Sequence, residues 1–340
     1  MIRIFASLLA IGASVFWFHP SLKAQDSFYK GKVVRIIVGA SAGGGYDTYS
    51  RTLARHMGRH IPGQPTLVVE NMPGAGFLIS ANYMFKVAKP DGLTIGHFIG
   101  GLFLQQLLEK PGIEFDARRF AYVGVPAQDN NVIGISRKTG IKSIEDWLAS
   151  KTLVKMGGVG AGSATDDVLK VLIATIGLPA QLVTGYKGTA EIRLAFNSGE
   201  LQGTSSSWES FKSTWRQELN SGELMIVLQN ISQAHRDLPK VPLAISFAKT
   251  DEARRLIRAL VHSYGATARP YVLPPGTSKD RVQTLQKAFT ATVKDSEFLA
   301  DARKAKLDIN PLSGAELERN IHEIFGLDAS LVAKAKEILK

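Results

Sequence analysis

Two glycine-rich loops carry the clearest indication of chemistry in this sequence. The first runs from Gly39 to Gly45 (GASAGGG), between an apolar β-branched run and a segment with helical spacing. The second runs from Gly157 to Gly162 (GGVGAG) in the same kind of place. Glycine lets the backbone approach a ligand closely, and the free N–H groups at a helix N-terminus attract anions. The two loops therefore predict that a small anion, such as a carboxylate, binds across a cleft.

The first loop also permits an enzymatic interpretation. Gly39, Ser41 and Gly43 match the G-x-S-x-G pattern of a nucleophile elbow, and Asp237 and His262 follow in the chain order of an α/β-hydrolase. The elbow would, however, follow the first strand of the mature chain, and the sequence has no HGGG-type oxyanion segment. A serine hydrolase using Ser41 is therefore the alternative function.

Other patterns exclude several kinds of site. In the second loop, Ser163 occupies the place of the third glycine of G-x-G-x-x-G, and no G-K-[ST] motif is present, so neither a dinucleotide nor a P-loop site is expected. His56 and His60 are four residues apart, but no H-E-x-x-H motif accompanies them. We therefore expect no cofactor and no metal ion.

The segments around the loops predict an α/β protein. Apolar, β-branched runs predict strands at residues 32–38, 67–70, 93–97, 132–135, 153–156, 181–184 and 224–228. Helical spacing predicts helices at 47–59, 75–88, 166–176, 189–197, 280–293 and 314–325, and Ser143 is expected to cap another that starts at 144. Strands that alternate with helices favour largely parallel sheets, which bind ligands in the loops at the carboxyl ends of their strands.

The N-terminus predicts export. Arg3 precedes an uncharged run at residues 4–18, and Ala24 supplies a small residue before a polar mature start. The run is shorter than the roughly 20 apolar residues that a membrane helix needs. We therefore expect a signal peptide at residues 1–24, and a soluble mature protein in the periplasm.

Composition narrows the possible partners. The chain has no cysteine, which excludes disulfides and thiolate metal sites. Its formal charge of +11 could attract nucleic acid, an anionic surface or acidic small molecules. The basic residues are scattered rather than clustered, and export argues against nucleic acid. A small acidic ligand is the expected partner.

Several longer segments resemble the substrate-binding proteins of tripartite tricarboxylate transporters, also called the Bug family. The most specific is the turn Asn71-x-Pro73-Gly74-Ala75-Gly76, followed by Pro90-Asp91-Gly92. The resemblance implies a two-lobed periplasmic-binding-protein type II fold, with a cleft between two mostly parallel sheets and a chain that crosses twice between the lobes. It places lobe 1 at residues 25–126 plus 241–340 and lobe 2 at 127–240. The segments that carry it lie at 34–51, 68–95, 157–172, 185–208 and 273–289.

The resemblance also implies a function and a set of ligand-binding residues. The protein would be a monomeric receptor and not an enzyme, capturing a small organic acid and delivering it to membrane permease subunits. The glycine loop of each lobe would hold one carboxylate through backbone N–H groups, with Asp47 bracing the first loop. The implied ligand-binding residues are Ala42, Gly43, Gly44, Asp47, Gly100, Gly101, Gly160, Ala161, Gly162, Ser163, Ala164, Tyr186, Lys187, Gly188, Ser205 and Ser206.

The sequence departs from the family pattern in ways that concern the ligand. Gly39-Ala40-Ser41 stands where members often have Pro-Phe or Pro-Tyr, and Asp166 or Asp167 replaces a common histidine. Ile99-Gly100-Gly101-Leu102 replaces a more polar segment. These changes remove polar donors and add apolar surface, so we expect an aromatic or aliphatic carboxylate with fewer oxygens than citrate. An exported receptor that reports ligand occupancy to a membrane kinase would use the same cleft.

Overall fold

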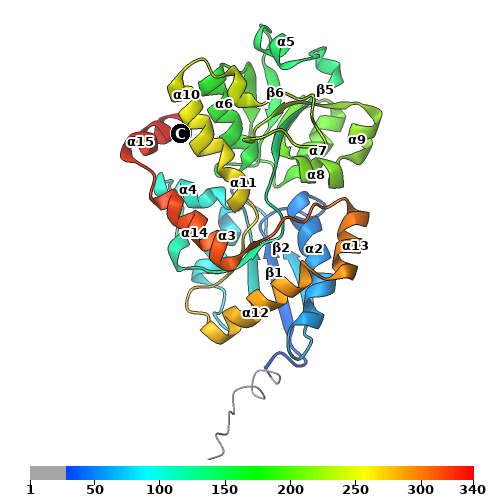
Figure 1. Ribbon diagram of the computed structural model, residues 1–340, viewed down its shortest axis with the longest axis vertical. Coiled ribbons are helices and arrows are strands. Elements are labelled where there is room, and N and C mark those ends of the chain that lie inside the picture. The colour runs from blue at the N-terminus through cyan, green and yellow to red at the C-terminus, as the bar shows by residue number, and fades with distance from the viewer. Residues whose placement is uncertain (1–27) are drawn as a thin grey trace, which may run out of the picture.

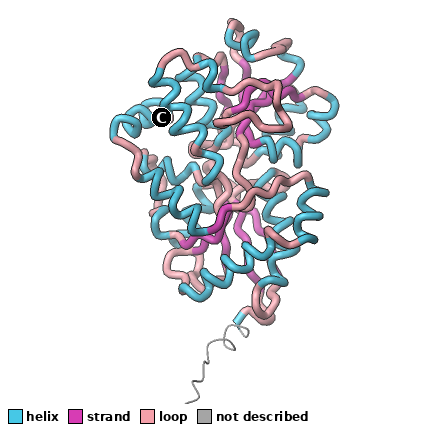
Figure 2. Tube along the Cα trace, in the orientation of Figure 1, coloured by secondary structure: helices cyan, strands magenta, loops and turns pink. Residues whose placement is uncertain are grey.

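The computed structural model describes residues 28–340, which form two α/β lobes (Figure 1). The lower lobe in this view contains both the blue N-terminal and the orange C-terminal segments, and the upper lobe contains the green middle of the chain. Helices flank the strands of both lobes (Figure 2). The expected signal peptide lies outside the described residues. Within the described part, no helix combines the length and apolar character needed to cross a membrane.

The sheet of the first lobe has six strands in the order β11-β4-β10-β3-β1-β2. β1 pairs in parallel with β2 and β3, whereas β10 is antiparallel to β3 and β4, and β11 is antiparallel to β4. The strands are β1 (Val33–Val38), β2 (Thr66–Asn71), β3 (Thr94–His97), β4 (Ala121–Val125), β10 (Tyr271–Leu273) and β11 (Leu312–Ser313). The helices are α2 (Gly45–Met57), η1 (Gly58–His60), α3 (Leu78–Lys86), α4 (Gly101–Leu107), η2 (Ala117–Arg119), α12 (Lys279–Thr292), α13 (Ser296–Ala305) and α14 (Gly314–Phe325).

The sheet of the second lobe has five strands in the order β7-β6-β8-β5-β9. β6 pairs in parallel with β7 and β8, and β5 is antiparallel to β8 and β9. The strands are β5 (Asn131–Ser136), β6 (Val154–Gly157), β7 (Ala180–Val183), β8 (Gly203–Ser207) and β9 (Leu224–Gln229). The helices that precede α10 are η3 (Arg137–Thr139), α5 (Ile144–Leu148), the π-helix η4 (Ala164–Val168), α6 (Leu169–Ile176), α7 (Thr189–Ser198), α8 (Trp208–Thr214), α9 (Arg216–Ser221) and η5 (Ala244–Phe247).

The two-lobed α/β fold is confirmed, but the sheets are mixed rather than mostly parallel. The crossings between the lobes explain the difference. β4 leads out of the first lobe and β10 leads back into it, so these neighbours run in opposite directions. The expected cap of α5 is confirmed, because the Ser143 hydroxyl accepts a hydrogen bond from the Asp146 N–H at 3.2 Å. The helix expected at 166–176 is instead divided between η4 and α6.

The second lobe also recruits segments from the C-terminal part of the chain. Leu256 and Ile257 of α10 (Asp251–Ile257) belong to the apolar core on one face of the second sheet, as do Leu331 and Leu339. The last helix, α15 (Ala329–Ile338), lies beside α6 in the upper lobe (Figure 1). The predicted boundary between the lobes at residue 240 stays a prediction. The packing of α10 on the second lobe favours a boundary later in the chain, after α10.

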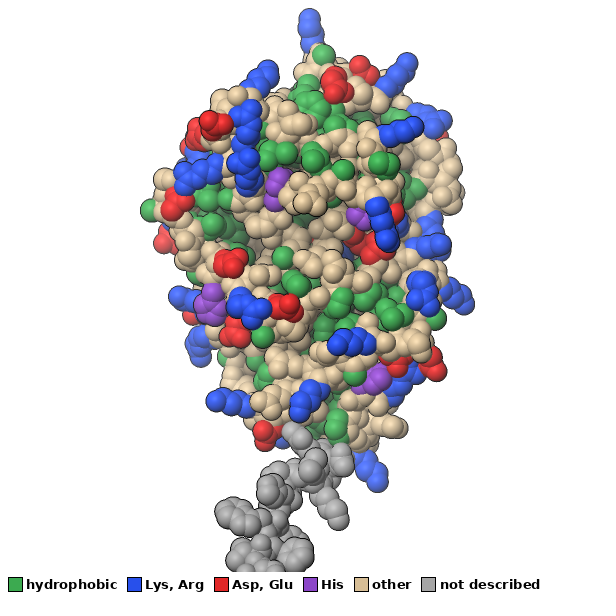
Figure 3. All heavy atoms as spheres, viewed as in Figure 1, with side chains coloured by type: hydrophobic (Ala, Val, Ile, Leu, Met, Phe, Trp, Pro, Cys, Tyr) green, Lys and Arg blue, Asp and Glu red, His purple; other side chains and the backbone are tan. Residues whose placement is uncertain are grey.

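Charged side chains are dispersed on the face shown in Figure 3. Blue lysine and arginine side chains are interspersed with red acidic ones over both lobes, as the scattered basic residues of the sequence predict. A protein that binds nucleic acid usually gathers its basic residues into a patch or stripe. This face offers no such stripe.

A buried histidine lies at the centre of the first lobe. The ring of His97, on β3, stacks on Tyr271 of β10 with 4.1 Å between ring centroids, and its Nδ1 is 3.0 Å from the carbonyl oxygen of Pro270. Burial lowers the pKa of His97 to about 3, although the bond to Pro270 opposes the shift, and the charge of Arg269 lowers it further. His97 is therefore neutral in the folded protein.

This neutral histidine predicts sensitivity to acid. The pKa of His97 is lower in the folded chain than its ordinary value of 6.5, so its contribution to stability is present above pH 6.5 and is lost as the pH falls towards 3. His97→Phe keeps the stacked ring but leaves the Pro270 carbonyl without its donor, at a cost of about 1–3 kcal/mol. The variant should melt at a lower temperature at neutral pH and lose less stability on acidification. The exposed His322→Phe is the control, and equal pH dependence in both variants would contradict the assignment.

Candidate functional site

A small cavity lies where the two lobes meet. Its volume is about 40 Å³, which holds only a few water molecules. Among the described residues that form its wall, only Arg269 and Asp129 have charged side chains. The lining residues are Ala40, Gly44, Gly45, Tyr46, Phe77, Ile99, Asp129, Val159, Ser163, Ala164, Thr165, Thr189, Ser206, Ser207, Ser210, Tyr264 and Arg269.

The N-terminus of α2 opens onto this cavity. Its N-cap residue is Gly44, and no side chain in the described part of the chain caps the helix. The preceding Gly43 has a φ of +82°, a left-handed conformation that favours glycine. Asp47 holds the loop in place, because its Oδ2 accepts a hydrogen bond from the Gly43 N–H at 2.9 Å and its carboxylate pairs with Arg51. The N–H groups of the first helical turn lack intrahelical partners and can donate to an anion.

Arg269 supplies the positive charge of the cavity. Its side chain is 1% exposed and forms an ion pair with Asp129. Its Nη2 donates to the hydroxyl groups of Ser207 and Ser210 at 2.8 and 2.9 Å. Its Nη1 is buried and has no hydrogen-bond partner among the described residues. A buried, charged donor without a partner is a strong attractant for an anionic ligand.

The surroundings of Arg269 keep it charged and direct it towards α2. Burial lowers the pKa of Arg269, but Asp129, Tyr46 and Tyr49 together outweigh burial, so the pKa lies above its ordinary value. The rings of Tyr46 and Tyr49 each lie 4.7 Å from the guanidinium carbon and add cation–π attraction. A Cβ placed on Gly45 would be 3.5 Å from Nη1, so the guanidinium group adjoins the uncapped start of α2. Together these two groups can hold a carboxylate.

The second glycine loop already uses several of its N–H groups. The N–H of Gly160 donates to Asp166 Oδ2 at 2.9 Å, and that of Gly162 donates to Asp167 Oδ2 at 3.0 Å. The N–H groups of Gly160 and Gly162, which were predicted to bind the ligand, are thus already bonded to carboxylates of the protein itself. In this form the second lobe offers the cavity mainly hydroxyl groups, such as those of Ser206 and Thr189.

The structure brings four of the expected ligand-binding residues together in the wall of the cavity. Gly44 belongs to the first lobe, and Ser163, Ala164 and Ser206 belong to the second. A further group of the expected residues lies where the lobes touch one another. That group consists of Gly101, Gly160, Ala161, Gly162 and Gly188.

The other expected residues lie outside the cavity wall. Ala42 and Gly43 are exposed in the first loop, and Asp47 braces it. The Gly100 N–H donates to the Ala268 carbonyl at 3.2 Å, and the Ser41 N–H donates to the Lys187 carbonyl at 3.1 Å. The Ser205 hydroxyl donates to Asn131 Oδ1 at 2.9 Å, and the Tyr186 hydroxyl donates to Glu200 at 2.6 Å. The side chains of Tyr186 and Lys187 therefore contribute nothing to this cavity, and their role in ligand binding stays a prediction.

Several residues of the cavity wall were not expected from the sequence, notably Arg269, Asp129, Tyr264, Thr189 and Ser210. One signal was available for Arg269. It is the only Asp, Glu, Lys or Arg between residues 259 and 278, within an apolar segment that reaches β10. An isolated charge in a buried segment usually has a specific partner.

The serine hydrolase alternative lacks the necessary geometry. Ser41 Oγ and His262 Nε2 are both buried without hydrogen-bond partners among the described residues. Asp237 instead accepts hydrogen bonds from the Trp208 indole and from Lys212, at 3.0 Å each. A catalytic triad requires hydrogen bonds that join its three members. The arrangement does not support catalysis by Ser41.

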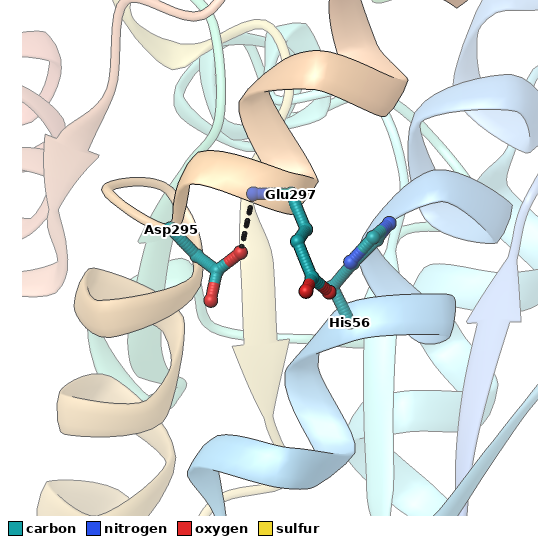
Figure 4. Close-up of side chains that lie close together, drawn as sticks. All are labelled: His56, Asp295 and Glu297. Carbon is teal, nitrogen blue, oxygen red and sulfur yellow. Dashed lines mark hydrogen bonds between the residues drawn. The ribbon is translucent and has the colours of Figure 1, made fainter.

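A separate cluster of possible metal ligands joins α2 to α13. Figure 4 shows His56 of α2 close to Glu297, with Asp295 at the start of α13. Asp295 caps α13 by accepting a hydrogen bond from the Glu297 N–H at 2.9 Å, and Arg59 forms ion pairs with both carboxylates. His56 Nε2 lies 2.9 Å from Asp301. These pairings account for the cluster as a network of ion pairs that fastens α13 to α2.

Glycines allow backbone from the two lobes to come into close contact. A Cβ on Gly101 would lie 1.9 Å from the carbonyl oxygen of Gly162, and one on Gly76 would lie 3.1 Å from the Cα of Gly160. Backbone from one lobe thus touches backbone from the other. The structure is a closed form that depends on the absence of side chains at these positions.

This contact predicts that Gly101→Ala keeps the lobes apart. The φ of Gly101 is not positive, so alanine suits its backbone, but the new methyl group collides with the opposite lobe. We expect a larger radius of gyration in small-angle X-ray scattering and a nearly unchanged melting temperature. Gly326→Ala is the matched control, because the nearest atom to its Cβ would be 3.4 Å away. Identical scattering from the two variants would show that this contact does not limit closure.

Comparisons with known proteins agree with this architecture. The chain is 24% identical over 298 residues to the "UPF0065 protein in gbd 5'region" of Cupriavidus necator, covering 85% of this chain and 82% of that protein. The solved structure of the periplasmic binding protein BugD has a TM-score of 0.74 at 19% identity, covering 91% of this chain and 98% of that one. MatC from Rhodopseudomonas palustris, solved with bound malate, has a TM-score of 0.70 at 17% identity, covering 91% and 99%.

The family assignment rests on most of the chain. The model of the family described as "Tripartite tricarboxylate transporter family receptor" matches residues 50–334. That span includes both sheets except β1, the second glycine loop and Arg269. The chain belongs to the tripartite tricarboxylate transporter receptor family.

Proposed function

We propose that this chain is a periplasmic solute-binding protein that captures a small carboxylate with an apolar body and delivers it to membrane permease subunits. The observation that carries the proposal is the unpartnered Nη1 of Arg269, buried beside the uncapped N-terminus of α2. This pair of groups would hold the carboxylate, and the protein would act as a monomer.

The rest of the cavity fits an apolar ligand body. Phe77 and Ile99 line the cavity from the first lobe, and Val159 and Ala164 line it from the second. Most of its polar groups are serine and threonine hydroxyls. The single cation, Arg269, is already balanced by one internal carboxylate. Two or three further carboxylates would lack partners in this low-dielectric space. A ligand with one buried carboxylate fits this charge balance better than citrate.

Relatives support the class of ligand and the absence of catalysis. MatC was solved with malate, and another R. palustris protein with adipate has a TM-score of 0.72 to this chain. Both ligands are small carboxylates, BugD is named a periplasmic binding protein, and the matching family is one of receptors.

Capture would proceed by closure of the two lobes. The ligand would contact α2 and Arg269 on one side and Ser206 and Thr189 on the other, so it stabilises the closed form because it touches both lobes. A cavity of about 40 Å³ also has to expand around any organic acid. Opening therefore serves both to admit the ligand and to enlarge the space that it occupies.

The first experiment is a thermal-shift and calorimetry screen of the mature, ligand-free protein with benzoate, hexanoate, adipate, malate and citrate. Stabilisation follows the ratio of free ligand to its dissociation constant, so a bound acid raises the melting temperature with concentration. We expect benzoate or hexanoate to bind more tightly than citrate. Tightest binding of citrate would contradict the apolar ligand, and no response to any carboxylate would contradict the receptor function.

Arg269→Lys tests the proposed anchor. Lysine keeps the charge next to Asp129 but lacks the planar fork that can bond Asp129, two serines and a ligand at once. We expect affinity for the best carboxylate of the screen to fall by at least about tenfold, or 1.4 kcal/mol. The exposed Arg236→Lys is the matched control and should bind as the parent does. Unchanged affinity in folded Arg269→Lys would remove Arg269 from the site.

A further inference from the structure

A second and larger cavity lies on the other side of Tyr264. Its volume is about 250 Å³, and Tyr264 lines both this cavity and the central one. Its wall is formed by α4, α14, the short helix α11 (Tyr264–Thr267) and the π-helices η4 and η6 (Arg258–His262). Figure 1 shows α11 between the lobes, near α4 and α14. π-Helical turns are rare and are often found at functional sites.

The wall of this second cavity is mainly apolar. Leu104, Leu260, Ile324 and Leu327 supply most of its large aliphatic side chains. A cavity of this size and character suits a small organic molecule with an apolar body.

The ionisable groups of the wall are all acidic. Asp167 is buried and Glu323 is exposed, and the described residues of the lining include no lysine, arginine or histidine. The wall therefore favours a cation over an anion, in contrast to the central cavity with Arg269.

One of the two carboxylate oxygens of Asp167 lacks a hydrogen-bond partner among the described residues. Asp167 is 4% exposed, and its Oδ2 accepts hydrogen bonds from Gln105 Nε2 at 2.7 Å and from the Gly162 N–H at 3.0 Å. Its Oδ1 is buried and has no partner within the described part of the chain. Burial raises the pKa of Asp167 to about 7, although both donors oppose the shift. A buried acceptor without a partner is costly, so a donor that reaches Oδ1 gains a strong bond.

We propose that this second cavity is a binding site for a small organic cation, whose ammonium group donates to Asp167 Oδ1 and whose apolar body packs on Leu104, Leu260 and Ile324. The ammonium supplies both the missing hydrogen bond and the charge that an ionised, buried carboxylate requires. Neither Arg269 nor the start of α2 lines this cavity, so the proposal does not rest on the carboxylate-binding function proposed above.

n-Hexylammonium and hexan-1-ol are suitable probes, because they share an apolar body and differ in charge. Isothermal titration of the mature protein at pH 8, where Asp167 is ionised, should show that the amine binds at least about tenfold more tightly than the alcohol. In Asp167→Asn this preference should disappear. Equal binding of the two probes, no binding of the amine, or an undiminished preference in folded Asp167→Asn would each overturn the proposal.

A second variant keeps the test decisive if Asp167→Asn does not fold. Ala266→Leu, on α11, places a larger side chain at the cavity wall and leaves the Asp167 carboxyl group itself unaltered. It should abolish binding of n-hexylammonium, whereas Ala329→Leu, at an exposed position at the start of α15, should not. Binding of the amine by Ala266→Leu as tightly as by the parent would place the amine elsewhere and overturn the proposal.

Discussion

The buried ion pair between Arg269 and Asp129 is the interaction on which the site depends. Asp129 lies in the first crossing between the lobes and Arg269 in the second, and the Asp129 N–H also donates to the Gly265 carbonyl at 3.1 Å. The pair thus ties the two crossings together where the lobes meet. Buried ion pairs add little net stability, but removing one partner typically costs about 3–5 kcal/mol. Its main effect here is geometric, because it fixes the guanidinium beside the start of α2.

Glycine serves two purposes in this protein, and the sequence does not distinguish them. Near α2, Gly43 and Gly44 shape an uncapped helix start that can receive an anion. At Gly101 and Gly162, glycine instead allows backbone from the two lobes to meet. The second loop also bonds its own carboxylates, so its N–H groups are partly used before a ligand arrives. A glycine-rich loop therefore indicates close approach of the backbone, and the partner can be a ligand or the opposite lobe.

Most of the fold could be predicted from local patterns, but much of the cavity could not. The apolar runs at β1, β3 and β5 identified strands, and Ser143 identified the start of α5. β8 was not predicted, because its sequence GTSSS lacks the apolar residues of the other strands. β10 was not predicted, because it has only three residues. Arg269 reaches Asp129 across 140 positions of sequence, and no local pattern encodes such a contact. Loops near the strand ends were therefore predictable, whereas the side chains that the crossings bring to them were not.

Tyr264 links the two cavities through one hydroxyl group. It donates to the Gly162 carbonyl at 3.1 Å and accepts from the Ala164 N–H at 3.0 Å, so it holds the second glycine loop against α11. Arg269 lines the cavity on one side of this ring, and Asp167 lines the cavity on the other. Opposite charges buried in separate compartments favour ligands of opposite charge, because a buried charge without a partner is costly. Since both compartments have walls from both lobes, separating the lobes would open both at once.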